Sequence, residues 1–249
     1  MTDKPIALIT GAAQGIGFAC AEALIEEGYD VILSDINAEG VATAGDQLGA
    51  LAVIVCDMGD LGQIEAMFAQ VAADHGPLSA LVNNAGVAMP GDFLSYDIDT
   101  FQRVIDINLR GVFVATQMAA RVMVEHKIAG AIVNMSSINA QVAIPQIPAY
   151  CASKGGVMQL TKVAALALAK NNIRVNAVGP GSIDTEMMAG VNANPEAFKA
   201  AMSRTPLGRA GDAREIGDVV AFLCSKKASY ITGETIYVDG GRLGLNYTC

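Results

Sequence analysis

Tyr150 and Lys154 are the residues whose types and spacing point most directly to chemistry. Lys154 follows Tyr150 by four positions, so in a helix both side chains lie on one side. A phenol ionises at about pH 10, which is too high for a base at neutral pH. A nearby ammonium, reinforced by the positive charge of a cofactor that accepts the hydride, favours the phenolate and is expected to lower this pKa. Although any surface helix can carry such a pair, it predicts a base that takes the proton of an alcohol as hydride leaves its carbon.

Two polar residues upstream extend this constellation. Ser137 follows a predicted strand over residues 131–135, and a serine there can donate a hydrogen bond to a substrate oxygen. Asn108 lies between two helical segments predicted over residues 100–125. Because asparagine disfavours a helix interior, Asn108 predicts a kink that frees a backbone carbonyl for a water molecule.

A glycine-rich turn near the start of the chain predicts a cofactor site. Residues 10–17 follow a short apolar run and open a helix, with the spacing Gly-x-x-x-Gly-x-Gly. Gly11 permits the tight turn, Gly15 lets the backbone approach a cofactor, and Gly17 lets the helix pack against the strand. Glycines also make ordinary turns, so the prediction of a pyrophosphate site depends on the position between a first strand and a first helix.

Asp35, at the end of the second predicted strand, bears on the choice of cofactor. A carboxylate there accepts hydrogen bonds from ribose hydroxyls and repels a 2′-phosphate. No Arg or Lys lies between Gly11 and Asp35, or at the two positions after Asp35. The sequence therefore favours NAD(H) over NADP(H). The alternative interpretations of Asp35 are a solvated aspartate at the end of a strand and a cap for the helix from Asn37 onward.

The third and fourth predicted strands also end in polar residues. Asp57 and Met58 follow a strand predicted over residues 51–56, and the Asn-Asn-Ala-Gly segment at 83–86 follows a strand over 80–82. Ligands of open α/β sheets bind beyond the carboxyl ends of the strands, so both segments are cofactor candidates. Taken singly, Asp57 also fits a helix cap, and residues 83–86 fit an ordinary turn.

These segments need a fold that brings strand ends together. Short apolar strands alternate with helices of roughly 10–20 residues, which is typical of βαβ crossovers. The sequence predicts one Rossmann-like α/β domain over residues 1–249, doubly wound, with a mostly parallel seven-stranded sheet flanked by helices on both faces. Residues 182–211 are predicted to be irregular and to form a substrate lid. A surface excursion without a role is the alternative.

The composition excludes several classes of protein. Hydrophobic residues make up 52% of the 249, enough for a sizeable core. A formal net charge of −9 argues against nucleic-acid binding, which needs a basic face. We expect no signal peptide, and no stretch reaches the roughly 18 apolar residues that cross a membrane. Five scattered cysteines and two histidines indicate reduced thiols, a cytoplasmic protein and no metal site.

Together the motifs resemble those of the classical short-chain dehydrogenase/reductase family, from about residue 5 to residue 241. Residues 10–17 resemble its cofactor turn, 83–86 its Asn-Asn-Ala-Gly segment, 180–185 its nicotinamide-carboxamide segment and 237–241 its closing strand. The family's catalytic tetrad is matched by Asn108, Ser137, Tyr150 and Lys154. Ser137 matches rather than Ser136, because it precedes the tyrosine by the family's usual spacing.

The resemblance implies a role for each tetrad residue. Tyr150 is the general acid/base, and Lys154 lowers its pKa and holds the ribose hydroxyls. Ser137 polarises the substrate oxygen, and Asn108 holds a water that relays protons. Hydride passes directly between the nicotinamide and the carbinol carbon. The expected NAD-binding residues are Gly11, Gln14, Gly15, Ile16, Gly17, Asp35, Asp57, Met58, Asn84, Ala85, Gly86, Tyr150, Lys154, Pro180, Gly181, Ile183 and Thr185.

The substrate pocket is less closely defined. Its wall is expected from residues 138–148 and 182–198. Amides suit the hydroxyls of a polyol or sugar, and methionines suit a flexible apolar group, although these residues also fit an ordinary surface loop. The expected substrate contacts are Ser137, Asn139, Gln146, Tyr150 and Met187.

Three functions remain open at this point. Asp35 favours NAD(H)-linked interconversion of a secondary alcohol, of polyol, sugar or hydroxy-ketone type, and its ketone. Reduction of 3-oxoacyl thioesters is the alternative, and a non-catalytic NAD-binding sensor is the third. The resemblance also implies a homotetramer, in which apolar faces over residues 104–124 and 157–169 pack between subunits. Ordinary burial of these faces against the sheet is the other explanation.

Overall fold

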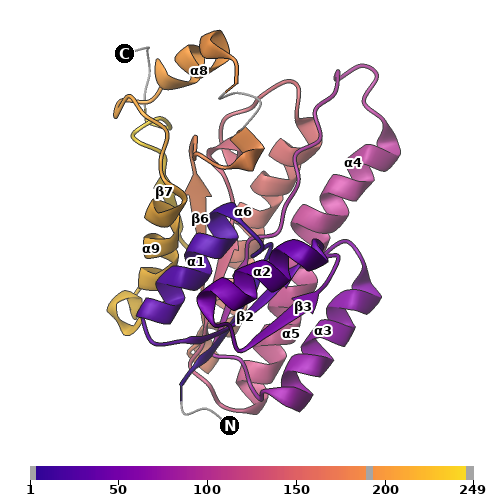
Figure 1. Ribbon diagram of the computed structural model, residues 1–249, viewed down its shortest axis with the longest axis vertical. Coiled ribbons are helices and arrows are strands. Elements are labelled where there is room, and N and C mark those ends of the chain that lie inside the picture. Colours follow the sequence, from indigo (N-terminus) through magenta and orange to yellow (C-terminus); the bar gives the residue numbers. More distant parts are fainter. Residues whose placement is uncertain (1–3, 189–192, 245–249) are drawn as a thin grey trace.

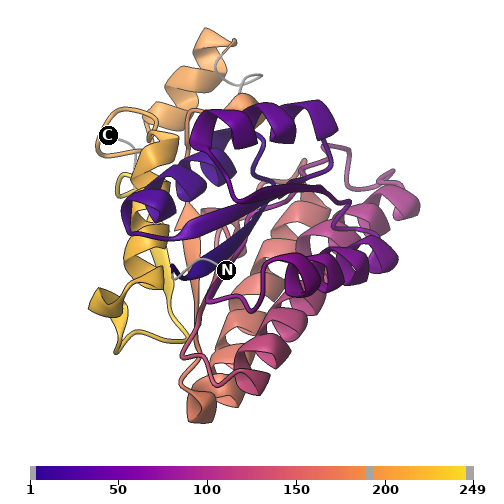
Figure 2. The same cartoon turned by 60° about the horizontal axis from the view of Figure 1, so that its bottom comes forward.

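A seven-stranded parallel sheet forms the centre of the protein (Figures 1 and 2). The computed structural model describes residues 4–188 and 193–244, without the side chains of residues 187 and 197. The strand order is β3-β2-β1-β4-β5-β6-β7, and every neighbouring pair is parallel. The strands are β1 (Ile6–Thr10), β2 (Asp30–Asp35), β3 (Ala52–Val55), β4 (Ala80–Asn83), β5 (Ala131–Met135), β6 (Arg174–Pro180) and β7 (Thr235–Val238). The predicted doubly wound, Rossmann-like α/β fold is confirmed.

Helices connect the strands and cover both faces of the sheet (Figure 2). The α-helices of the described residues are α1 (Gly15–Glu26), α2 (Ala38–Leu48), α3 (Leu61–Asp74), α4 (Ile98–Ile105), α5 (Val112–Glu125), α6 (Pro148–Leu168), α8 (Pro195–Met202) and α9 (Ala213–Cys224). A π-helix, Asp106–Gly111, joins α4 to α5. Short 3-10 turns occupy Ile138–Ala140, Ala169–Asn171, Glu186–Met188 and Lys226–Ala228.

Alternate residues of the strands supply two separate apolar layers. In β1, Ala7 and Ile9 pack with α1, α2 and α9, whereas Leu8 packs with α3, α5 and α6. Successive side chains of a strand point to opposite faces, so a sheet covered on both sides needs apolar residues at every position. This explains why all five residues of β1 and all five of β5 are buried.

The order of the strands creates a crevice at one edge of the sheet. β2 and β3 lie to one side of β1, whereas β4 to β7 lie to the other. The carboxyl ends of β1 and β4 therefore meet where the chain reverses its progress across the sheet, which is where open α/β sheets bind ligands. The glycine turn after β1 and the Asn-Asn-Ala-Gly segment after β4 both lie at this point.

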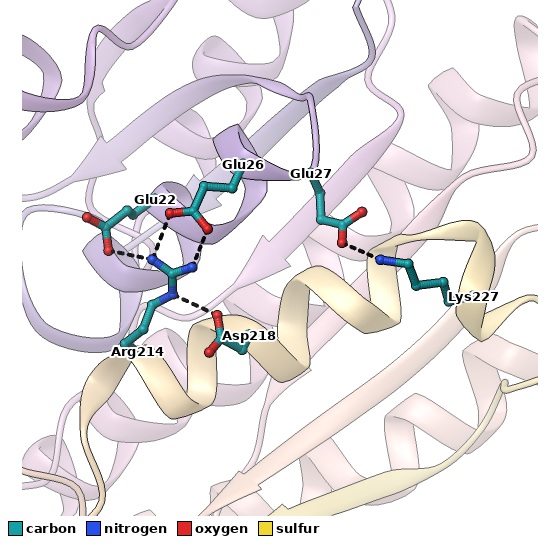
Figure 3. A network of polar contacts seen from close by, with 6 residues as sticks. All are labelled: Glu22, Glu26, Glu27, Arg214, Asp218 and Lys227. Atoms are coloured by element: carbon teal, nitrogen blue, oxygen red, sulfur yellow. Dashed lines mark hydrogen bonds and ion pairs between the residues drawn. The ribbon is translucent and has the colours of Figure 1, made fainter.

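Helices α1 and α9 are held together by close packing and by a cluster of charges (Figure 3). A Cβ atom on Gly217 would lie 2.5 Å from the Ala19 carbonyl oxygen, so the helices approach closely. Arg214 pairs with Glu22 at 3.1 Å, with Asp218 at 2.6 Å, and with Glu26. These contacts fix the start of α9 against the helix that follows the glycine turn.

The segment between β6 and α9 differs in part from its prediction. Residues 182–211 were expected to be irregular, but they contain a 3-10 turn and α8. Asn194 and Pro195 are a helix-start signal rather than loop residues, because the Asn194 side chain accepts a hydrogen bond from Glu196 N at 3.1 Å and proline suits the first helical position.

The two ends of this segment lie side by side. Ile183 forms a parallel bridge with Gly211, Asp184 N donates to Gly211 O at 2.8 Å, and Gly211 N donates to Ser182 O at 2.9 Å. The segment that connects β6 to α9 is thus closed at one narrow neck. Across the described residues, none of the helices combines the length and apolarity needed to span a membrane.

Candidate active site

A groove of about 370 Å³ runs along the carboxyl ends of β1 to β4. Most of the residues predicted to bind the cofactor line it: Gly11, Gln14, Gly15, Ile16, Asp35, Asp57, Met58, Asn84, Ala85, Gly86 and Thr185. Seven lining residues were not predicted: Ile36, Cys56, Val87, Met89, Arg103, Ile107 and Glu186. The structure therefore brings together segments from the carboxyl ends of five different strands, β1, β2, β3, β4 and β6.

The glycines of the turn fit the close approach of a dinucleotide. Gly11 has φ +65°, and a Cβ atom there would lie 2.7 Å from Ala85 Cα. A Cβ atom on Gly17 would lie 2.0 Å from Gly11 O, so Gly17 is required for packing although it does not line the groove. Gly15 has φ +57°, a conformation that glycine adopts without strain. The free N–H groups at the start of α1 suit a pyrophosphate.

The Asn84 side chain connects the end of β4 to the glycine turn by hydrogen bonds. Its Nδ2 donates to Gly11 O at 2.8 Å and to Thr10 O at 3.1 Å. In return, Thr10 Oγ1 accepts hydrogen bonds from Asn84 N at 3.1 Å and Ala85 N at 3.2 Å. These hydrogen bonds hold the carboxyl ends of β1 and β4 next to each other.

Among the charged side chains that line the groove, acidic ones predominate. Asp35 accepts hydrogen bonds from Ala13 N and Asn37 N, both at 3.0 Å, which points its carboxylate toward the glycine turn. Asp57 and Glu186 also line the groove. Arg103 is the one cation among the described lining residues, and it is already paired with Asp57 at 2.7 Å.

Lys154 and Tyr150 lie together near one end of α6. Lys154 Nζ is 5.5 Å from the centre of the Tyr150 ring and donates to Met135 O at 2.7 Å. Lys154 is only 3% exposed, and this burial lowers its pKa to about 8. The pKa of Tyr150 is raised, because burial outweighs the lowering effect of its hydrogen bond with Ser137.

The expected lowering of the Tyr150 pKa combined Lys154 with a cationic nicotinamide, whereas the protein alone raises this pKa by burying the phenol. The ammonium is engaged with a backbone carbonyl, and the protein alone desolvates the phenol. The positive charge of an oxidised nicotinamide would act against the effect of burial and favour the phenolate.

Ser137 and Ser136 are distinguished by their contacts. Ser137 Oγ donates to Asn139 Oδ1 at 3.2 Å and accepts from Asn139 N at 3.1 Å, on the side where Tyr150 lies. Ser136 Oγ donates to Lys154 O at 3.2 Å within the core. Ser137 is therefore the serine available to a substrate oxygen.

Asn108 lies in the π-helix, where the wider turn replaces the kink predicted from the sequence. Its Oδ1 accepts from Val87 N and its Nδ2 donates to Val87 O, both at 2.9 Å. Nδ2 also donates to Ser153 Oγ at 3.1 Å. Because all the polar atoms of the side chain are engaged by protein, only its backbone is left to contact a water.

Gly86 connects the groove to these catalytic candidates. It lines the groove, and a Cβ atom on it would lie 3.3 Å from Asn108 Oδ1 and 3.5 Å from Lys154 Nζ. A ligand that runs along the groove past Gly86 reaches the ammonium of Lys154. The arrangement suits a base, a buried cation and a hydrogen-bond donor acting at the end of a bound dinucleotide.

Some predicted residues are not brought into the groove. Pro180 and Gly181 pair with the end of β7, and the Ile183 side chain is buried in the core. Gln146 lies on the exposed loop before α6, where its carbonyl accepts from Gly91 N at 2.8 Å. The Met187 side chain lies outside the described part of the structure.

Known proteins resemble this chain over nearly its whole length. Residues 11–242 match the family model described as enoyl-(acyl carrier protein) reductase. The chain is 41% identical to cis-4-hydroxycyclohexanecarboxylate dehydrogenase of Sinomonas cyclohexanicum, with 95% of each protein covered. It is 40% identical to the 3-oxoacyl-(acyl-carrier-protein) reductase FabG of Thermotoga maritima, covering 95% of this chain and 96% of the relative. It is also 40% identical to galactitol 2-dehydrogenase (L-tagatose-forming) of Cereibacter sphaeroides, covering 96% and 95%.

A solved structure agrees with this relationship. The gluconate 5-dehydrogenase of Burkholderia cenocepacia, in complex with NADP and tartrate, superposes with a TM-score of 0.92 at 32% identity, covering 98% of this chain and 97% of the other. The chain belongs to the short-chain dehydrogenase/reductase family, whose members use a nicotinamide cofactor. Its relatives are oxidoreductases that act on alcohols and ketones.

Proposed function

We propose that this protein is an NAD(H)-dependent oxidoreductase that interconverts a secondary alcohol and its ketone. The observation that carries the proposal is the position of Lys154, a buried ammonium 5.5 Å from the Tyr150 ring and next to Gly86 of the groove. A cofactor bound in the groove would supply the hydride acceptor, and its positive nicotinamide would add to the Lys154 ammonium a second charge that favours ionisation of Tyr150.

Each catalytic candidate then has a distinct part in oxidation. Tyr150 Oη takes the hydroxyl proton of the alcohol while the carbinol carbon loses hydride. Ser137 Oγ leaves Asn139 and donates to the substrate oxygen, which positions the substrate. Lys154 holds the ribose and stabilises the phenolate. In reduction, Tyr150 returns the proton to the ketone oxygen.

A preference for NAD(H) over NADP(H) is part of the proposal. Asp35 points to the glycine turn, and three lining carboxylates oppose one guanidinium. This charge balance disfavours the additional phosphate of NADP(H). The B. cenocepacia relative binds NADP, so the preference must be tested on this chain. Replacing Asp35 by Ser is expected to raise KM for NAD⁺ about tenfold and to improve use of NADP⁺.

The proposed substrates are alcohols of polyol, sugar or hydroxy-ketone type. The amide of Asn139 next to Ser137 supports this choice, and a relative that oxidises galactitol agrees with it. Reduction of 3-oxoacyl thioesters is the second candidate, because the T. maritima relative is named for that reaction. We propose that residues 182–211 form the lid of this substrate site, within a single domain spanning residues 1–249.

We also propose a homotetramer. α5 and α6 leave apolar side chains exposed on one face, and Phe113, Val124 and Val163 border a hollow of about 490 Å³ there. Such a contiguous apolar face is typical of a subunit interface. A cytoplasmic location fits the four free cysteines among the described residues.

The test measures NADH and NADPH by near-ultraviolet absorbance. NAD⁺ and NADP⁺ are offered with secondary alcohols, diols, polyols and sugars, and the reduced cofactors with ketones and acetoacetyl thioesters. Turnover of a polyol or diol with NAD⁺, lost in Tyr150→Phe, is the expected result. Turnover only of thioesters with NADPH would replace the proposal by the second candidate. NADH binding without any turnover would indicate a sensor.

A further inference from the structure

Two arginines from a later part of the chain bind the turn between β3 and α3. Arg103, from α4, pairs its Nη2 with Asp57 Oδ2 at 2.7 Å. Arg110, from the π-helix, donates from Nη2 to Gly59 O at 2.8 Å and pairs with Asp106 at 2.9 Å. The turn therefore depends on side chains that come from a helix far along the chain.

The fit between this turn and the helix is close. A Cβ atom on Gly59 would lie 2.2 Å from Arg103 Nη1, and one on Gly111 would lie 2.3 Å from Met58 O. The Arg103 guanidinium thus lies directly against the backbone of the turn. A planar group held in this way is already ordered before a ligand arrives, which reduces the entropy lost on binding.

The Asp57 carboxylate is held at both oxygens. Oδ1 accepts from Gly59 N at 2.8 Å, and Oδ2 accepts from Arg103. Burial tends to raise the pKa of Asp57, but the hydrogen bonds from Arg103 and Gly59 lower it below its ordinary value. Removing Arg103 would leave one oxygen of a half-buried carboxylate without its partner.

The position of Arg103 along the groove indicates which part of a dinucleotide it faces. The catalytic end lies beyond β4, where Gly86 meets Lys154. Asp35 marks the ribose position at the end of β2, and the sheet continues from β2 to β3 on the side away from β4. Arg103 and Asp57 line the groove on that far side. The adenine ring is the part of the cofactor that remains to be accommodated there.

We propose that Arg103 is a positioning residue for the adenine half of the cofactor. It holds the Asp57 carboxylate in place to accept a hydrogen bond from the adenine amino group, and its planar guanidinium forms one wall against the ring. The inference rests on the proposed use of NAD(H). It assigns a function to a helix-surface arginine that belongs to none of the sequence motifs.

The test compares Arg103→Met, Arg103→Lys and a control, Lys227→Met. The control removes another ion pair, Lys227 with Glu27 at 2.8 Å, near the opposite edge of the sheet (Figure 3). Binding of NADH and of 5′-AMP is measured by calorimetry. Turnover is measured with saturating NADH and with reduced nicotinamide mononucleotide, which lacks adenine.

Arg103→Met is expected to weaken binding of both NADH and 5′-AMP by about tenfold, with kcat at saturating NADH and turnover with the mononucleotide unchanged. Arg103→Lys should recover part of the lost binding affinity, because lysine restores the positive charge but not the planar guanidinium group. Lys227→Met should bind like the wild type.

Three results would overturn the inference while leaving the proposed function intact. The first is that Arg103→Met binds 5′-AMP as tightly as the wild type does. The second is that Arg103→Met loses as much turnover with the mononucleotide as it loses affinity for NADH. The third is that Lys227→Met loses as much NADH affinity as Arg103→Met does. A wild type that binds no NADH and oxidises no alcohol would instead remove the proposed function itself.

Discussion

The two ends of the cofactor groove hold their residues by different means. At the phosphate end backbone lies against backbone, since a Cβ atom on Gly17 would lie 2.0 Å from Gly11 O. At the catalytic end polar side chains make the contacts, since the Asn108 amide bonds the backbone of Val87 and the hydroxyl of Ser153. The first end thus depends on the close fit of the backbone, and the second depends on the charges and hydrogen bonds of its side chains. Substitutions at the first should therefore affect folding and cofactor binding, and substitutions at the second should affect chemistry.

The largest expected effect on turnover is at the catalytic end. Tyr150→Phe removes one hydroxyl and leaves the ring, so kcat should fall about a hundred- to ten-thousand-fold. NADH affinity and the thermal unfolding midpoint should stay close to those of the wild type, which calorimetry can measure. A variant that keeps near-native turnover would show that Tyr150 is not the acid/base.

A matched pair of glycine variants tests the phosphate end. Gly17→Ala places a methyl group 2.0 Å from a backbone oxygen, so the free energy of unfolding should fall by about 3 kcal/mol or folding should fail. Gly15→Ala has room, with Thr185 Cγ2 at 3.4 Å, and bears only the strain of φ +57°, about 1 kcal/mol. Urea unfolding measures both. Equal losses would show that packing does not distinguish the two glycines.

Lys154→Met should abolish activity while it increases the stability of the fold at pH 7. The folded protein lowers the pKa of Lys154 from 10.5 to about 8, so the unfolded chain binds more protons between these values. Stability should therefore rise with pH across that window, by about 1 kcal/mol per unit, with the burial cost fully present below pH 8.

The methionine variant carries no such charge. It should be inactive, more stable than the wild type at pH 7, and nearly insensitive to pH between 8 and 10 in urea titrations. Lys154→Arg is the control that keeps a buried cation. If the methionine variant were instead less stable at pH 7, the hydrogen bond to Met135 would outweigh the cost of burying the charge.

The smallest expected effect lies outside the groove, at the α1–α9 contact. Arg214 pairs with three carboxylates but is partly exposed, and such pairs contribute little and are screened by salt. Arg214→Met should lower the thermal unfolding midpoint slightly at low ionic strength and hardly at all at high ionic strength, with turnover unchanged. A large, salt-independent loss would mean that the cluster fixes the glycine turn.

Much of the fold was predictable from local patterns. The bounds predicted for β5 agree with the structure, because this strand is a short run rich in apolar residues between clear turn signals. The irregularity at Asn108 was also predictable, although its form as a π-helix was not. α8 was missed because Asn194 and Pro195 occur in turns as well as at helix starts.

The groove was predictable only where motifs define it. Gly11, Asp35 and Asn84 follow strands and could be found from the sequence alone. Arg103 could not, because it lies within an ordinary helix and reaches the groove only when α4 packs beside the turn after β3. The direction in which the protein shifts the pKa of Tyr150 could not be predicted from the sequence either, since it depends on how deeply the phenol is buried.

The narrow neck at Ile183 and Gly211 has an evolutionary consequence. Because the two ends of the segment between β6 and α9 are bonded to each other, its middle part can change in length while these ends keep their positions. Doubling such a loop costs only about 0.6 kcal/mol in closure entropy. The part of the segment beyond Thr185 and Glu186 can thus be exchanged as a cassette. In its proposed role as a lid, it would allow new substrates to be acquired while the cofactor groove is inherited unchanged.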